Sequence, residues 1–567
     1  MDRILRVNMS TLTTTEEPFP AEWIALGGRA LSAKILLKEV DPTCDPLGPA
    51  NKLIFAPGCL SGSTAPTSGR ISVGAKSPLT RGIKESNSGG QCGQKLARLG
   101  YRAVIVEEQP ADREKRYQLT ITKDGVSLTE RSDLKGLRNY ACAAKLAAEC
   151  GKRAAFMLCG PAGEARLTGA TVALTDEDNR YPTRHAARGG LGAVMGSKGL
   201  KAVIVDDEGS TARMAKDPKA FKELVGSVVK AYKGGSQMYA RGTSALVPLA
   251  NMVQTLPTRN RREMQFEHAN AIDGARIIEN FETRGGGMHN CMTGCIVQCS
   301  NVVNAPDGSY KTSALEFETL ALMGSNCCIS DLDAIASMDR LCDELGIDTM
   351  EAGGALAVAM DGGKLTFGDA EAVLRTLDQV DKGDELATAI ANGVVFTGKK
   401  YGVARIPAVK GQGIPAWEPR TLKATGISYC TSPMGADHTA GLVAGPASDA
   451  ARASQNSQIA NAICDSSGFC QFMQPSVEEM RQFLNLMYGL DLSEEGIVAY
   501  GWQCLQDEWE FNRRAGFTEK DDALPEWMTT EAIPSNGAVF DVPADEIRRV
   551  YTQMEITPKL LKLRVAT

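Results

Sequence analysis

The sequence lacks the features that would place the protein in a membrane, outside the cell or on nucleic acid. No run of about 18 apolar residues occurs, so we expect no transmembrane helix. Residues 1–6 lack the apolar core of a secretion signal, which predicts a cytoplasmic protein. The net charge is a mild −6 and no basic block interrupts the chain, which argues against nucleic acid as a partner.

Histidine is also scarce, with four residues in the chain. One of them, His438, stands in the small-residue stretch 435–441 (GADHTAG). Such a stretch suits a tight site in which an imidazole acts near neutral pH. A lone histidine more often has a structural role, so His438 needs support from other residues.

The 567 residues suffice for two to four domains. Residues 1–206 read as a β-rich N-terminal domain, because short β-branched runs there are separated by turn residues. Residues 207–567 read as a mainly helical region of two domains. The fold class expected is therefore α+β. The runs are 3–8, 52–56, 70–73, 102–106, 117–122 and 201–205, and the helices are 218–233, 331–345, 369–380, 448–463, 476–488 and 544–554.

Two internal repeats suggest a pseudo-twofold site for two copies of one ligand. In the first part, residues 86–107 and 187–206 each contain a glycine cluster, a helix-length stretch, and the strand AVIV followed by an acid. In the helical part, residues 343–348 and 465–470 share the form DxxG followed by an apolar residue. Chance recurrence of short glycine motifs is the alternative.

The glycine clusters can expose N–H groups that bind phosphate. The second cluster is not a dinucleotide fingerprint, because Gly196 comes one residue too late for GxGxxG after Gly190 and Gly192. The polar, basic residues 178–188 also predict that no strand precedes it. A pair of helix-to-strand turns is the structural alternative.

Cysteine is plentiful, with 16 residues, and most should be small buried apolar groups in a reduced compartment. Cys291, Cys295 and Cys299 form an unusual C-x3-C-x3-C group. With Cys470 as a fourth ligand they could bind a [4Fe–4S] cluster. A zinc site that uses the nearby His289, and buried cysteines without a metal, are the alternatives.

Glu316 and Glu318 lie in an apolar frame (LEFETL) just after the cysteine group. Apolar surroundings raise the pKa of a carboxyl group and let it carry a proton. The alternative is that these acids stabilise the first turn of a helix.

Together these motifs resemble the tungsten-containing aldehyde:ferredoxin oxidoreductase family, over nearly the whole chain from residue 4 to beyond Cys470. None of the motifs is specific alone. The most telling parts are SPLT at 77–80, NSGG at 87–90, GPAGE at 160–164, GAVMGSK at 192–198 and the two DxxG motifs.

The resemblance implies one tungsten or molybdenum held by the sulfurs of two pterins, a magnesium ion that bridges the pterin phosphates, and one [4Fe–4S] cluster. By position, the phosphates and magnesium would be bound by Arg70, Asn87, Gly89, Arg188 and Gly189, and the pterin rings by Asp343, Ile347, Asp348, Asp465 and Phe469. The cluster ligands would be Cys291, Cys295, Cys299 and Cys470.

The resemblance also implies a reaction, the oxidation of small aldehydes to carboxylic acids, with ferredoxin or a polyferredoxin-like Fe–S subunit as electron acceptor. Glu318 and His438 match the residues near the metal. Glu318 would take a proton, and His438 would polarise or protonate the carbonyl oxygen. The same cofactor acting reductively on acids, acyl thioesters or aromatic rings, and a non-catalytic Fe–S electron-transfer subunit, remain open alternatives.

Two departures from the family pattern concern metals. The first gap in the cysteine group is three residues, whereas better-known members have two, which leaves cluster binding intact. Some members join two subunits through an iron held by Glu-x-x-His ligands, and residues 334–337 (AIAS) lack them. We therefore expect any homodimer to form without a bridging iron.

Overall fold

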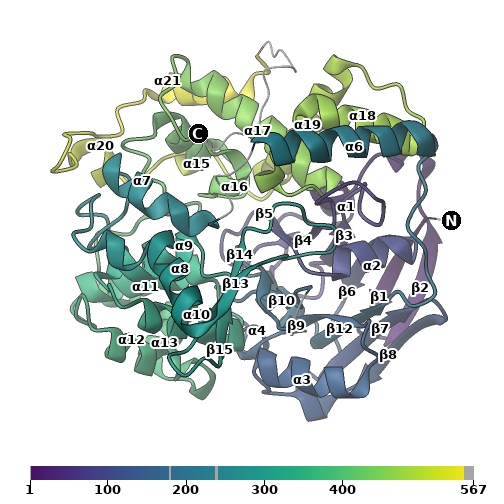
Figure 1. Ribbon diagram of the computed structural model, residues 1–567, viewed down its shortest axis with the longest axis horizontal. Helices are drawn as coiled ribbons and strands as arrows, with labels where there is room; N and C mark the ends of the chain where they lie inside the picture. The colour runs from purple at the N-terminus through teal and green to yellow at the C-terminus, as the bar shows by residue number, and fades with distance from the viewer. Residues whose placement is uncertain (1, 178–179, 236–240, 555–567) are drawn as a thin grey trace.

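The computed structural model describes residues 2–177, 180–235 and 241–554. Figure 1 shows the N-terminal strands in purple and blue beside a teal helical block, with a green and yellow helical block across the top. No helix within the described ranges is long and apolar enough to cross a membrane.

The first sheet has six strands in the order β2-β1-β6-β3-β4-β5. They are β1 (Arg3–Asn8), β2 (Thr13–Pro18), β3 (Leu53–Pro57), β4 (Ile71–Lys76), β5 (Ile83–Ser88) and β6 (Tyr101–Glu107). Strand β1 pairs with β6 in parallel, and the other pairs are antiparallel. Strands β3 and β4 are buried along their whole length, which explains why they read as continuous apolar or small-residue runs.

The second sheet repeats this topology, strand for strand. Its order is β11-β10-β9-β12-β7-β8. Read from the other end, β8-β7-β12-β9-β10-β11, this is the order of the first sheet with six added to each strand number. The strands are β7 (Tyr117–Thr122), β8 (Gly125–Glu130), β9 (Ala155–Cys159), β10 (Val172–Leu174), β11 (Arg184–Ala186) and β12 (Leu200–Asp206). The parallel pair is again the first strand with the last. The α+β class and the pseudo-twofold repeat of the β-rich region are confirmed.

The helices of this region repeat too. Helices α1 (Gly28–Glu39) and α3 (Asn139–Glu149) follow the second strand of each sheet. Helices α2 (Cys92–Arg98) and α5 (Leu191–Ser197) follow the glycine clusters. The repeat inferred from the glycine clusters is therefore part of a larger one.

The absence of a strand before the second glycine cluster was a wrong prediction. Arg184–Ala186 forms β11, which pairs antiparallel with β10. Pairing with a buried neighbour overrides the weak strand propensity of these polar residues. A dinucleotide-binding fold is still ruled out, because it needs the strands before and after the glycine loop to be neighbours in the sheet. Strands β11 and β12 are not neighbours.

The helical region begins with α6 (Pro218–Gly235). The helices that follow are α7 (Leu246–Met252), α8 (Gly274–Arg284), α9 (Phe317–Thr319), α10 (Leu332–Leu345), α11 (Thr349–Asp361), α12 (Ala370–Leu377), α13 (Glu385–Ala391), α14 (Val394–Tyr401), α15 (Lys423–Thr431), α16 (His438–Gly441), α17 (Ala450–Ser467), α18 (Val477–Tyr488), α19 (Glu494–Arg514), α20 (Trp527–Thr530) and α21 (Ala544–Arg548). A three-stranded sheet, β13 (Gly286–His289), β14 (Ser300–Asn304) and β15 (Tyr310–Ser313), brackets the cysteine group. The small hairpin β16 (Ala408–Val409) and β17 (Gln412–Gly413) completes the strands of the described residues.

Helix α17 joins the two regions. It packs against α19 and against α1 of the first sheet, within one continuous apolar core (Figure 1). The helix expected over residues 544–554 is shorter than predicted, because Arg549–Tyr551 continue it as a 3₁₀ turn.

Candidate active site between the repeated sheets

The two DxxG motifs are helix ends that rest on the two sheets in the same way. Helix α10 stops at Gly346 and α17 at Gly468, each in the left-handed conformation. Gly468 lies against Gly58, which follows β3, and Gly346 lies against Gly160, which follows β9. A Cβ on Gly58 would be 2.1 Å from the Cα of Gly468, so only glycine at this position lets the two backbone segments approach so closely.

The backbone fixes these ends further. The amide of Arg70, just before β4, donates to the Gly468 carbonyl at 3.2 Å. The amide of Thr171, just before β10, donates to the Gly346 carbonyl at 2.9 Å. Asp343 and Asp465 therefore occupy matching places above the two sheets.

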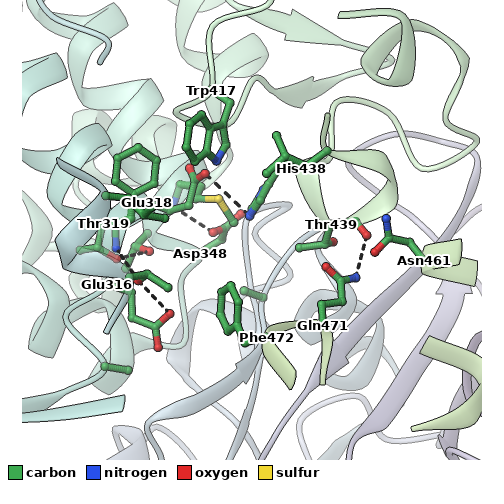
Figure 2. Close-up of a pocket in the computed structure, with 18 of the residues that line it drawn as sticks. Glu316, Glu318, Thr319, Asp348, Trp417, His438, Thr439, Asn461, Gln471 and Phe472 are labelled. Atoms are coloured by element: carbon green, nitrogen blue, oxygen red, sulfur yellow. Dashed lines mark hydrogen bonds and ion pairs between the residues drawn. The ribbon is translucent and has the colours of Figure 1, made fainter. Parts of the chain in front are cut away.

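A cavity of about 300 Å³ opens beside these helix ends (Figure 2). Its lining combines apolar and aromatic side chains with polar ones, three of which are acids, and no Lys or Arg is among its lining residues in the described ranges. The residues of its wall used below are Glu316, Phe317, Glu318, Asp348, Trp417, His438, Gln471 and Phe472. Such a lining suits an uncharged organic ligand with a few polar contacts.

Glu318 and His438 face each other inside this cavity, below Trp417 (Figure 2). The Oε1 atom of Glu318 lies 3.7 Å from Nε2 of His438, and the amide of Ala416 donates to Oε2 at 2.7 Å. Glu318 Oε1 and His438 Nδ1 have no hydrogen-bond partner among the described residues. A half-buried acid and imidazole that line a cavity and keep unpaired atoms are arranged for proton transfer to a ligand.

The loop before His438 is held from three sides. Asp437 caps α16 through the amide of Thr439 at 3.0 Å, and its Oδ2 lies 2.6 Å from Nζ of the buried Lys84. Arg188 donates to the Ala436 carbonyl at 2.7 Å. Burial alone would raise the pKa of Asp437, but Lys84 and Arg188 hold it well below its usual range. The position of His438 thus depends on the two N-terminal sheets.

A second cavity, of about 200 Å³, is lined by three of the five residues expected to bind the pterin phosphates and their magnesium. Arg70, Asn87 and Arg188 line it together with Asp465. Arg70 donates to the Asn87 side chain, which fixes the guanidinium at the end of β5. Gly189 has φ +86°, and a Cβ there would lie 2.4 Å from Cγ of Lys84. Only glycine allows this approach of the loop.

The predicted ring-binding residues lie at the helix ends. Asp343 Oδ1 is 2.9 Å from Nε2 of His185, and Asp348 caps α11 at the Met350 amide and lies 3.4 Å from Arg188. Ile347 is buried, and its backbone forms an isolated antiparallel β-bridge with Ala170.

The other ring-binding set has different partners. Asp465 Oδ2 is 3.5 Å from Nη1 of Arg29, and Gln471 donates to Oδ1 at 3.3 Å. Burial raises the pKa of Asp465 to about 6. Phe469 is fully buried, with its ring 5.3 Å from that of Phe483, so only its backbone is available to a ligand.

A third cavity, of about 230 Å³, brings together Cys291, Cys299 and Cys470. Cys295 adjoins it, because the Cys291 thiol donates to the Cys295 sulfur, which raises the pKa of Cys291 and lowers that of Cys295. A Cβ on Gly89, the predicted phosphate-loop glycine, would be 3.3 Å from Cys291 Sγ. The phosphate loop and the cysteine group thus touch.

The chemistry of these cysteines fits an iron–sulfur cluster. The four cysteines of a [4Fe–4S] site surround the cluster, and a cavity lined by thiols is what such a group requires. The residues present therefore fit the group.

Sequence reasoning missed two residues of these cavities. Glu85 lies two positions before Asn87 on the same strand, and lines the second cavity; burial raises its pKa to about 8. The period-two alternation of a strand could have revealed it. Arg184 lines the cysteine cavity, and nothing in the polar stretch around it marked it out.

Comparisons with known proteins agree with this geometry. Residues 4–207 match the model of the aldehyde ferredoxin oxidoreductase N-terminal domain, and residues 220–557 match that of domains 2 and 3. The chain belongs to the aldehyde ferredoxin oxidoreductase family. The resemblance seen in the sequence is thus confirmed, and the protein is an oxidoreductase of a family whose tungsten-containing members imply a tungsten–pterin cofactor, an aldehyde substrate and ferredoxin.

Similar proteins are found in Thermococcus and Pyrococcus species. The tungsten-containing aldehyde ferredoxin oxidoreductase of Thermococcus kodakarensis is 32% identical, over 99% of this chain and 95% of its own. That of Pyrococcus furiosus is 31% identical, over 94% and 92%. An aliphatic sulfonate oxidoreductase, WOR-like subunit, of Pyrococcus furiosus is 27% identical, over 83% and 78%.

A solved structure shares the fold. The active-site complex BamBC of benzoyl coenzyme A reductase, with 1,5-dienoyl-CoA, superposes with a TM-score of 0.81, covering 97% of this chain and 92% of that one. Its sequence identity is 20%, so the similarity speaks to the fold alone.

Proposed function

We propose that the protein oxidises small uncharged aldehydes to carboxylic acids and passes the electrons through a [4Fe–4S] cluster to ferredoxin or a partner Fe–S subunit. The observation that carries the proposal is the Glu318–His438 pair in a cavity whose described lining has no Lys or Arg, beside a cavity lined by Arg70, Arg188 and Asp465. The cysteine cavity shares Arg70 and Glu316 with its neighbours, which supports a short route for electrons.

The cofactor that fits is a bis-pterin tungsten or molybdenum group, which when bound accepts the two electrons of the reaction. Arg70, Asn87, Gly89, Arg188 and Gly189 would hold its phosphates and their magnesium ion, since guanidinium forks and exposed loop amides suit phosphate. Asp343, Ile347, Asp348, Asp465 and Phe469 would hold the two pterin rings. Cys291, Cys295, Cys299 and Cys470 would bind the cluster.

The reaction balances as aldehyde plus water giving carboxylic acid, two protons and two electrons. Glu318 Oε1 accepts the proton released when water adds to the carbonyl carbon, because its Oε2 is already engaged by Ala416. His438 donates from Nε2 toward the carbonyl oxygen, where negative charge develops. The aromatic wall of Trp417 and Phe472 limits the access of water to these two groups.

The reductive alternatives have less support. An acyl-CoA thioester carries phosphates that need cationic contacts, and the described lining of the catalytic cavity has no Lys or Arg. A small uncharged aldehyde needs none.

The test is the paired substitution of the acid and the imidazole, with Glu318→Gln and His438→Gln. We expect aldehyde-dependent dye reduction to fall by about 10²–10⁴-fold in each, with tungsten or molybdenum and iron contents unchanged. Full activity in both variants would refute the roles proposed for Glu318 and His438, and a wild-type protein without aldehyde-dependent activity would favour a non-catalytic electron-transfer subunit.

Elemental analysis of protein purified without oxygen tests the cofactor separately. We expect about one tungsten or molybdenum and four iron atoms per chain, as one metal centre and one [4Fe–4S] cluster require. Zinc without iron or either heavy metal would refute the proposal.

A further inference from the structure

Residues 259–261 form a left-handed turn without glycine. Arg259, Asn260 and Arg261 have φ angles of 51°, 49° and 60°, and no other two adjacent non-glycine residues in the described ranges share this conformation. L-residues normally visit it singly, because Cβ then crowds the following carbonyl oxygen. Such strain persists only where the surrounding structure enforces it, and it clusters at functional sites.

The turn is fixed by backbone contacts from two directions. The Asn326 carbonyl accepts the amide of Asn260 at 3.1 Å, and the Asn326 side-chain oxygen accepts the amide of Arg261 at 3.2 Å. Thr258 and Glu263 close the turn through an isolated antiparallel β-bridge. The result is that the Arg261 side chain lies in the interior, with none of its surface exposed.

The guanidinium of Arg261 binds the chain on both sides of Ala416. Its Nη2 donates to the carbonyl of Ile414 at 2.8 Å and also to the carbonyl of Pro415. Its Nη1 donates to Oε2 of Glu418 at 3.0 Å. A planar guanidinium can bind three such acceptors at once, whereas an ammonium group lacks this fixed fork.

Arg420 completes a buried triad with Arg261 and Glu418. Its Nε donates to Oε1 of Glu418 at 2.7 Å, and its Nη2 donates to the Arg261 carbonyl at 2.9 Å. All three side chains have no exposed surface. A buried network of this kind makes the segment that it includes rigid, and that segment is residues 414–418.

The same segment reaches the catalytic cavity. The Ala416 amide donates to Oε2 of Glu318 at 2.7 Å, and Trp417 belongs to the cavity wall above Glu318 and His438 (Figure 2). The other carboxylate oxygen, Oε1, lies 3.7 Å from Nε2 of His438. The orientation of this acid therefore depends on where residues 414–418 hold the Ala416 amide.

We propose that Arg261 is a positioning residue of the active site, which holds residues 414–418 so that the Ala416 amide engages Oε2 of Glu318 and leaves Oε1 to accept the proton. The inference rests on the proposed function, because it requires the catalytic role of Glu318. A displacement of about 1 Å at a reacting group can lower a rate by about 10²-fold. The left-handed turn is then the means by which the chain brings Arg261 to this segment.

The test compares the reduction of benzyl viologen by acetaldehyde, per bound tungsten or molybdenum, in the wild type and Arg261→Lys, each with and without Glu318→Gln. R261K keeps a charge but loses the planar fork. We expect its kcat to fall by about 10–10²-fold with KM unchanged, because the acid acts in the transition state. In the E318Q background R261K should cause no further fall, since the group that it positions is already removed.

The matched control is Arg259→Lys, in the same left-handed turn, where the ion pairs with Glu263 and Glu267 lie at the surface. Its kcat should equal that of the wild type. An unchanged kcat in R261K, a change confined to KM, or an equal fall in the presence and absence of E318Q would overturn the inference. The last result would mean that Arg261 acts on the fold and not on Glu318.

If R261K is not recovered with its metals, Asn326→Ala decides. It removes the side-chain acceptor of the Arg261 amide and leaves the three charges of the triad in place. A lower kcat at unchanged KM in N326A supports the inference, and a wild-type kcat overturns it. Full activity in E318Q alone would instead contradict the proposed role of Glu318, so the two failures are distinguishable.

Discussion

Replacing Asp437 by Asn separates the charge of this residue from its role as a helix cap. Its Oδ2 lies 2.6 Å from Nζ of Lys84, and both side chains are at most 3% exposed. Asn caps a helix as well as Asp does, so the bond from the Thr439 amide to the side chain is kept. What is lost is the counter-charge of a buried lysine.

The expected cost is large. Breaking a buried ion pair by removing one partner costs about 3–5 kcal/mol, because the remaining charge stays in the interior. The folded-state pKa of Asp437 lies below the value of about 3.9 for an unfolded aspartate. The contribution of the pair is therefore fully present at neutral pH and is lost only as pH falls through the folded-state pKa.

The assay is urea denaturation followed by tryptophan fluorescence at pH 7, for D437N and for Lys84→Met/Asp437→Asn. The double variant has no unpaired charge and should recover most of the lost stability, since replacing both partners of a buried pair is often close to neutral. A cost below about 1 kcal/mol in D437N, or a double variant no more stable than D437N, would refute the reasoning.

Three further predictions concern neighbouring parts of the site. Cys295→Ser should lower the iron content of the purified protein, whereas Cys504→Ser, which does not line the cysteine cavity, should leave it unchanged. Gly189→Ala should lower the free energy of unfolding, because φ is +86° and the new Cβ would lie 2.4 Å from Lys84 Cγ. Gly226→Ala, in a helix with open space around the new Cβ, should raise the free energy of unfolding by about 0.5–1 kcal/mol. Glu85, with its pKa raised to about 8 by burial, favours the folded state while it is protonated. Stability should therefore fall as pH rises from about 4.3, the unfolded value, through about 8, and Glu85→Gln should flatten this decline.

The sequence predicted best those elements whose pattern is local. Strand β12 contains AVIV between polar residues, and the structure has it within one residue at each end of the predicted run. Helix α11 could not be found by periodicity, because residues 351–360 are buried on every side and show no polar face. Strand β11 depends on pairing with β10, which a single sequence does not reveal.

The residues of the candidate site divide in the same way, into those that stand in a recognisable motif and those that only the fold brings into place. Motif residues such as Asn87 and Asp465 could be proposed because the motifs in which they stand resemble those of a known family. Lys84 and Arg184 have no such pattern. Their importance arises from strands that bring them to Asp437 and to the cysteines, which are remote in sequence.

The repeat also shows where the two halves of the site differ. Asn87 on β5 and His185 on β11 hold equivalent positions, since they pair with Ser72 and Ala173 one residue inside each sheet. The residues that they contact are equivalent as well: Arg70 donates to Asn87, and Thr171 hydrogen-bonds His185 at 2.7 Å.

The matching backbone therefore supports unlike chemistry. On one side Asp465 lies near two arginines, Arg29 and Arg70, whereas on the other Asp343 lies 2.9 Å from His185. Both halves reach the cysteine cavity, because Arg70 of one and His185 of the other are among its lining residues. A pseudo-symmetric fold can thus present two matching sites of different chemistry to one cavity, because the side chains, and not the backbone, break the symmetry.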